Sequence, residues 1–81
     1  MLTKEALTDE YRELLIDALD PPERDALREG RAVANDFMDA NMLMLDAFKT
    51  VFGRELITDD GVADDDMAVV NHAMMEAEKS V

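Results

Sequence analysis

The residues of this sequence whose types and spacing could do chemistry are mostly carboxylates. From position 55 to position 78 there are eight acidic residues and no Lys or Arg, and five of them crowd together: Asp59, Asp60, Asp64, Asp65 and Asp66. Such a cluster can hold a cation, but an EF-hand loop needs an acidic first ligand and Gly at its sixth position. Counting back from Gly61 puts Leu56 first. We therefore expect no metal site and a cluster that acts through its charge.

A second group of acidic residues lies near the start of the chain. Asp9, Glu13 and Asp17 recur every four residues, and Asp20 follows them. On a helix such residues lie one turn apart, about 6 Å along the axis, which is on the scale of the phosphate spacing in a nucleic-acid strand. Together with the aspartates of residues 59–66, they predict an acidic face that binds a basic partner. The alternative is that both groups only keep the surface solvated.

Other reactive side chains are few. His72 is the only histidine, and Glu76 follows it by one helical turn. Two potential ligands fall short of the three or four that proteins supply to zinc. A general base also needs a nucleophile, but the chain has no cysteine and a single serine, Ser80. We expect His72 to be a partly exposed helix residue, and we expect no catalytic residue and no cofactor.

The overall charge narrows the classes of partner. The 81 residues carry a formal net charge of −12, with a pI near 4.1, so direct binding to nucleic acid or to an anionic membrane is not expected. With 48% hydrophobic residues the chain is too apolar for disorder, and we expect one helical domain over residues 1–81. No cysteine, signal peptide or long apolar run is present, so we expect a cytoplasmic protein.

The longest helical pattern, which would position most of these residues, runs from Pro21 to Phe52. Asp20 precedes it and can cap the first turn while Glu23 reaches back to the Asp20 amide, with proline at the first helical position. Gly53 follows the run and is suited to the left-handed conformation that ends helices. These signals predict a helix with defined ends.

Within that run, apolar residues recur at helical spacing and predict a core-facing stripe. Gly30 interrupts the pattern and leaves two options: one helix that is kinked or closely packed at Gly30, or a short helix that ends there with a second beginning near Arg31. Asn41 lies on the stripe, either at its edge in contact with water or fixing the register of a helix pair. The apolar members are Leu27, Ala34, Phe37, Met38, Met44, Leu45, Phe48, Val51 and Phe52.

Two flanking helices are predicted. The first is capped by Thr3 or Thr8 and stops by Leu19 or Asp20, because the residue before a proline disfavours helical geometry. The last begins near Asp64 or Asp65, and its expected buried face consists of Met67, Val70, Met74 and Ala77, assisted by Ala73 and Val81. The fold class is therefore all-α: a small bundle of three to four helices built around a long central helix, with no sheet.

Some apolar residues are expected to remain outside the core. Met42 and Met75 fall off the buried faces, and methionine is common on adaptable binding surfaces. We expect them, with Phe48 and Phe52, to form a self-association surface. This is the basis of the second functional hypothesis, a self-assembling homodimeric scaffolding module.

The chain resembles two known groups of proteins in general properties. In length and charge it is similar to acyl carrier proteins, but that family carries phosphopantetheine on a serine at the start of its second helix, where this chain has Asp20-Pro21-Pro22. In size, charge and helicity it is similar to the small acidic proteins that phages use against restriction and CRISPR systems. The second resemblance implies our leading hypothesis: a non-enzymatic inhibitor or adaptor that occupies the nucleic-acid-binding surface of a basic protein.

Overall fold

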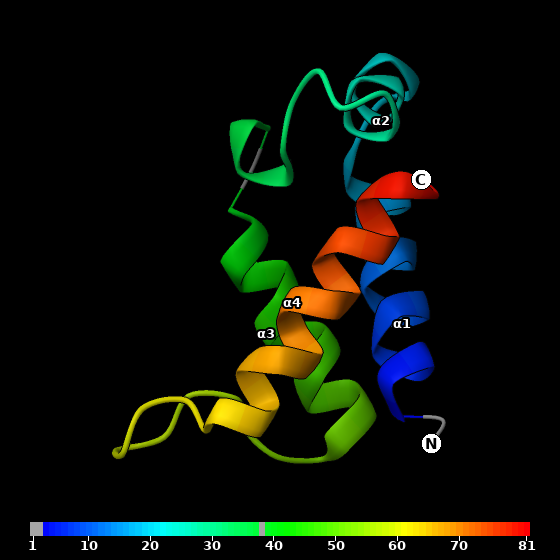
Figure 1. Ribbon diagram of the computed structural model, residues 1–81. Coiled ribbons are helices and arrows are strands. Elements are labelled where there is room, and N and C mark those ends of the chain that lie inside the picture. The colour runs from blue at the N-terminus through cyan, green and yellow to red at the C-terminus, as the bar shows by residue number, and fades with distance from the viewer. Residues whose placement is uncertain (1–2, 38) are drawn as a thin grey trace.

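The computed structural model describes residues 3–37 and 39–81, and within them the chain is an all-α bundle (Figure 1). Its helices are α1 (Thr3–Ala18), α2 (Pro21–Arg28), α3 (Ala40–Phe52) and α4 (Asp64–Lys79), with a short 3-10 helix at Ala34–Asp36. No strand is present in these residues, and Thr58 and Gly61 form only an isolated bridge. The predicted fold class is confirmed. Nor is any helix of this part of the chain long and apolar enough to cross a membrane.

The first helix is the element against which α3 and α4 pack. Leu7, Tyr11 and Leu15 recur every four residues on α1 and are completely buried, because α3 and α4 both pack against this helix. We expected the run from Pro21 to Phe52 to be central, and that expectation was wrong. The end of α1 at Ala18 fits the prediction. Thr8, however, does not cap α1, because it lies within the helix and its hydroxyl donates to the Lys4 carbonyl at 2.9 Å.

The expected central run is interrupted after α2. Gly30 has φ of +76°, and the amides of Gly30 and Arg31 donate to the carbonyls of Leu27 and Ala26 at 3.2 and 2.9 Å. These two bonds form a Schellman motif, which ends a helix by turning the chain through a left-handed residue. Of the two options for Gly30, the short helix is therefore correct. The next α-helix, however, begins at Ala40 and not near Arg31.

Local capping explains where α2 and α3 begin and where α3 ends. Glu23 accepts from the Asp20 amide at 2.8 Å, as the capping-box pattern predicted. Asp39, which the sequence analysis did not single out, caps α3 by accepting from the amides of Asn41 and Met42 at 3.1 and 3.3 Å. Gly53 ends α3 with φ of +71°. The predicted stripe residue Met38 lies outside the described residues.

The fourth helix begins at Asp64, as predicted, and most of its predicted buried face is confirmed, with Met74 half-buried against the core. Val70, Ala73 and Ala77 are buried and Val81 beyond the helix joins them. Met67 is 43% exposed, so its assignment to the buried face was wrong. Its side chain lines a surface groove together with Met44 and Leu45 of α3.

Candidate functional site

The loop between α3 and α4, residues 53–63, carries the first part of the predicted acidic cluster. Thr58 and Gly61 exchange two backbone hydrogen bonds of 3.0 and 2.9 Å, and the Thr58 hydroxyl accepts from the Asp60 amide at 3.3 Å. These bonds form a tight turn that leaves Asp59 and Asp60 exposed. Figure 1 shows this loop, in yellow, projecting from the bundle on the side away from α1.

An ion pair fixes the base of this loop to the start of α4. Arg54 donates two hydrogen bonds to the Asp66 carboxylate, at 2.9 and 3.0 Å. The Arg54 guanidinium also lies over the rings of Phe48 and Phe52, 5.0 and 5.7 Å from their centroids. The hydrogen bond from Arg54 lowers the pKa of Asp66 below its ordinary value. Asp66 is therefore neutralised within the chain.

The remaining acidic residues of the cluster have no such partner. Asp59, Asp60, Asp64 and Asp65 are exposed, and none of them forms an ion pair within the described residues. Three successive aspartates in the first turn of α4 also suit the positive end of the helix dipole. Four of the five predicted residues thus form an acidic cluster without an internal counter-charge.

The acidic residues of α1 do not continue this cluster. Glu13 and Asp17 are exposed on α1, but α1 and the α3–α4 loop lie on opposite sides of the view in Figure 1. Asp9 is paired with Arg12 at 2.9 Å, and Asp20 contributes its amide to the start of α2. The helical arrangement therefore places the two predicted groups of acidic residues on different parts of the bundle.

The ion pairs of the described residues are local in the sequence. Each ion pair joins residues no more than twelve positions apart, and most of the twenty acidic residues remain without one in the described structure. Exposed pairs of this kind contribute little to stability, about 0–1 kcal/mol each. The cations that form them are Arg12, Arg28, Arg31, Lys49, Arg54 and Lys79.

An apolar groove lies beside the acidic cluster. It has a volume of about 390 Å³ and is formed by α3, the α3–α4 loop and α4. Ile57 and Met67 on its wall are 57% and 43% exposed. The sequence did not predict the groove, because it forms only where the tertiary fold brings residues of α3, the loop and α4 together. Its apolar lining includes Leu45, Leu56, Ile57, Val62, Met67 and Met74.

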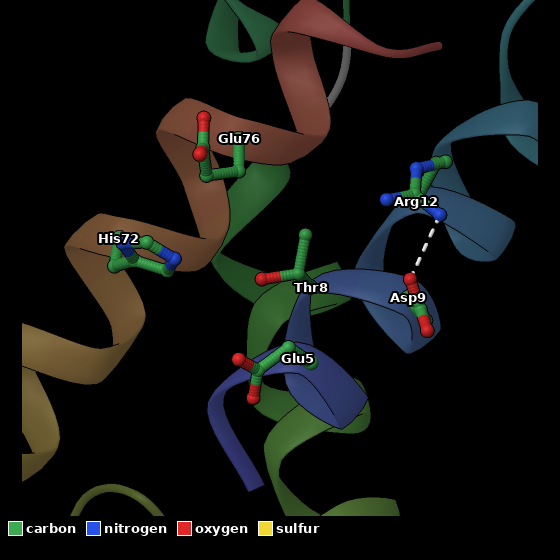
Figure 2. Close-up of a pocket in the computed structure, with 6 residues that line it drawn as sticks. All are labelled: Glu5, Thr8, Asp9, Arg12, His72 and Glu76. Atoms are coloured by element: carbon green, nitrogen blue, oxygen red, sulfur yellow. Dashed lines mark hydrogen bonds and ion pairs between the residues drawn. The ribbon is translucent and has the colours of Figure 1, made fainter. Parts of the chain in front are cut away.

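A second groove, between α1 and α4, contains the only histidine. Figure 2 shows the imidazole of His72 directed from α4 toward Glu5 and Thr8 of α1, with Glu76 on the same helix. The groove has a volume of about 400 Å³. His72 is exposed. Thr8 is only 6% exposed and its hydroxyl donates to the Lys4 carbonyl, so this hydroxyl is not presented to a substrate. Among the described residues, no three metal-ligating side chains come together.

The residues expected to self-associate do not form one surface. Met42 and Met75 are 56% and 60% exposed, as expected. Phe48 is completely buried against α1, so its assignment to an interface was wrong, and Phe52 is half-buried and stacked on Phe48 with ring centroids 4.3 Å apart. Met75 instead lies with Val33 in a hollow between α4 and the segment after α2.

Comparisons with protein-family models, with curated proteins and with solved structures find no match to this chain.

Proposed function

We propose that this protein is a non-enzymatic acidic binding protein whose α3–α4 loop and α4 start occupy a basic, nucleic-acid-binding surface of a partner protein. It acts there as an inhibitor or adaptor, of the kind that phages use against restriction and CRISPR systems. The observation that carries the proposal is the cluster of exposed aspartates without an internal counter-charge: Asp59, Asp60, Asp64 and Asp65.

The way the cations are distributed supports this proposal. Within the described residues Arg54 is the only cation that forms an ion pair with an aspartate of the cluster, and it is held by Asp66 and lies over two aromatic rings. The other four aspartates therefore keep their full negative potential toward a partner. Complementary charge of this kind speeds association and selects basic partners while it repels nucleic acid itself.

A cytoplasmic location belongs to the same proposal. A chain without cysteine gains nothing from an oxidising compartment, and nucleic-acid-binding proteins are the proposed targets. The acidic residues Glu13 and Asp17 on α1 lie apart from the cluster and are available for a second, weaker contact.

Affinity capture followed by a salt titration tests the proposal. The protein is immobilised, incubated with a native bacterial lysate at low and high ionic strength, and the captured proteins are identified. We expect to capture a basic, nucleic-acid-binding protein whose affinity for this chain falls steeply as salt screens the charges. Duplex DNA should compete with this chain for the captured protein. Affinity that does not change with salt contradicts the proposal.

Matched neutralising variants locate the surface. The double variant Asp59→Asn and Asp60→Asn removes two charges from the cluster, and the double variant Glu5→Gln and Glu10→Gln removes two charges from α1. We expect the first to weaken capture at least tenfold and the second to leave it nearly unchanged. An equal loss in both variants would mean that only net charge matters.

A further inference from the structure

The apolar groove and the acidic cluster share the same structural elements. The α3–α4 loop contributes Ile57 and Val62 to the groove wall and Asp59 and Asp60 to the turn between them. The first turn of α4 carries Asp64 and Asp65, and Met67 of the groove follows them after Asp66. None of these aspartates lines the groove itself, so a molecule in the groove contacts mainly apolar side chains and lies next to the loop and the helical turn that carry the carboxylates.

The groove wall is suited to an apolar helix face. Its volume, about 390 Å³, accommodates a few large side chains, and its methionine and isoleucine side chains can adjust to their occupant. Met42 is exposed on α3 one turn before Leu45, which lies in the groove, so apolar surface continues along the helix. Amphipathic helices bind such grooves through apolar residues at three- and four-residue spacing.

The charge around the groove decides what kind of helix fits. No Lys or Arg lines it in the described residues, and Arg54 beside it is already paired with Asp66. An occupant with acidic flanks would meet unscreened like charge. A second copy of this chain carries the same net charge of −12, so this face is unfavourable for a homodimer.

We propose that the groove formed by α3, the α3–α4 loop and α4 binds an amphipathic helix of the partner, with an apolar stripe in the groove and Lys or Arg residues against the loop and the start of α4. This inference rests on the proposed function and adds the form of the partner's recognition element. Apolar contact supplies the affinity and register, and the carboxylates select for positive flanks.

Designed helical peptides test this inference directly. One peptide has a Leu and Met stripe with Lys flanks, a second has the same stripe with Glu flanks, and a third has the Lys flanks with Ser and Gln in place of the stripe. Binding to the full chain is measured by fluorescence anisotropy and calorimetry. We expect only the first peptide to bind saturably, at least tenfold more tightly than either of the others.

Two pairs of variants separate the contributions of the groove and the charge. Ile57→Ser lowers the apolar contact in the groove, and its control is Val33→Ser at an equally exposed site, 53% against 57% exposed, outside the groove. We expect Ile57→Ser to lower the affinity for the first peptide about tenfold, which corresponds to about 1.4 kcal/mol. We expect Val33→Ser to leave this affinity nearly unchanged. The Asp59 and Asp60 double neutralisation and its α1 control complete the set. Circular dichroism confirms that every variant keeps its helices.

The outcomes distinguish failure of this inference from failure of the proposed function. If neutralising Asp59 and Asp60 weakens binding while Ile57→Ser does not, the groove is not the site and the acidic surface stands. If Ile57→Ser weakens binding while the neutralisation does not, the charge hypothesis fails. Equal binding of the Glu-flanked peptide, absence of saturable binding by the Lys-flanked peptide, or sedimentation as a dimer that Ile57→Ser dissociates each overturns the inference.

Discussion

Arg54 donates two hydrogen bonds of 2.9 and 3.0 Å to the Asp66 carboxylate, and this ion pair joins the end of α3 to the first turn of α4. Because the Arg54 guanidinium also covers the rings of Phe48 and Phe52, the base of the α3–α4 loop is attached to the core. The aspartates that extend beyond this base are therefore presented from an anchored position. Replacing either partner should free the loop without unfolding the bundle.

The first prediction concerns the pH dependence of this pair. The pKa of Asp66 is lowered from its ordinary 3.8, so the pair stabilises the fold fully above that value and its contribution is lost as pH falls through the lowered pKa. We expect Asp66→Asn to be less stable than the parent protein at neutral pH, and the difference to shrink in acid. Urea denaturation at several pH values measures it.

Asp65→Asn is the control for this prediction, because Asp65 is exposed and forms no ion pair in the described residues. Asp65→Asn removes the same charge from the same helical turn. The difference in stability between this variant and the parent protein should therefore not shrink in acid to a comparable extent. If the Asp66→Asn difference persists unchanged at low pH, the ion pair is not its cause.

The second prediction concerns Tyr11, the only tyrosine of the chain. Burial, and then the negative charge of Glu78, raise its pKa to about 12 from an ordinary 10.0. The absorbance change of tyrosinate formation should therefore appear near pH 12 while the protein is folded. The pKa of Tyr11 is higher in the folded than in the unfolded protein. The contribution of this shift to the free energy of unfolding is therefore fully present below pH 10 and is lost as pH rises through 12. A titration near pH 10 in folded protein would contradict this.

The third prediction uses the same side chain at neutral pH. The Tyr11 hydroxyl is buried and has no hydrogen-bond partner among the described residues. Removing an unpaired buried hydroxyl relieves a desolvation cost, so Tyr11→Phe should leave stability unchanged or raise it by up to about 1 kcal/mol. Tyr11→Ala, which also removes the ring, should cost about 3–5 kcal/mol. Denaturant titrations compare the two, and a large loss in Tyr11→Phe would reveal a bonded hydroxyl.

The fourth prediction compares two side chains of α3. Phe48 is completely buried, whereas Met42 is 56% exposed. Phe48→Ala should lower the free energy of unfolding by about 3–5 kcal/mol, because it leaves a cavity against α1. Met42→Ala should change it by no more than about 0.5 kcal/mol. Thermal or urea denaturation measures both, and a mild effect at Phe48 would contradict its place in the core.

The fifth prediction concerns Gly30→Ala, whose effect on stability has opposite signs in a continuous and in an interrupted run from Pro21 to Phe52. In one continuous helix, Gly30→Ala would stabilise the protein by up to about 1 kcal/mol. With φ of +76° at Gly30, the same change forces a side chain into the left-handed region and should destabilise by about 1–2 kcal/mol. Gly53→Ala, at φ of +71°, is the positive control, since it should destabilise in either case. Stabilisation by Gly30→Ala would contradict the interrupted run.

Local signals in the sequence were sufficient for most helix ends. Asp20 with Glu23, Gly53, and the aspartates at the start of α4 each mark a boundary that the structure has. Capping depends on neighbouring backbone groups, so a few adjacent residues determine it. Asp39 carries the same kind of signal directly before Ala40 and marks the start of α3.

The sequence by itself also determined the helical class, through apolar residues at helical spacing, and the excess of negative charge. Only the tertiary structure decided that α1 is the central helix, that Phe48 is internal while Met67 is exposed, and that the acidic residues divide into separate groups. An apolar stripe indicates that one face of a helix is buried, but it does not indicate which helix packs against that face. That choice depends on contacts between distant segments, and the packing of these segments also forms the groove lined by α3, the α3–α4 loop and α4.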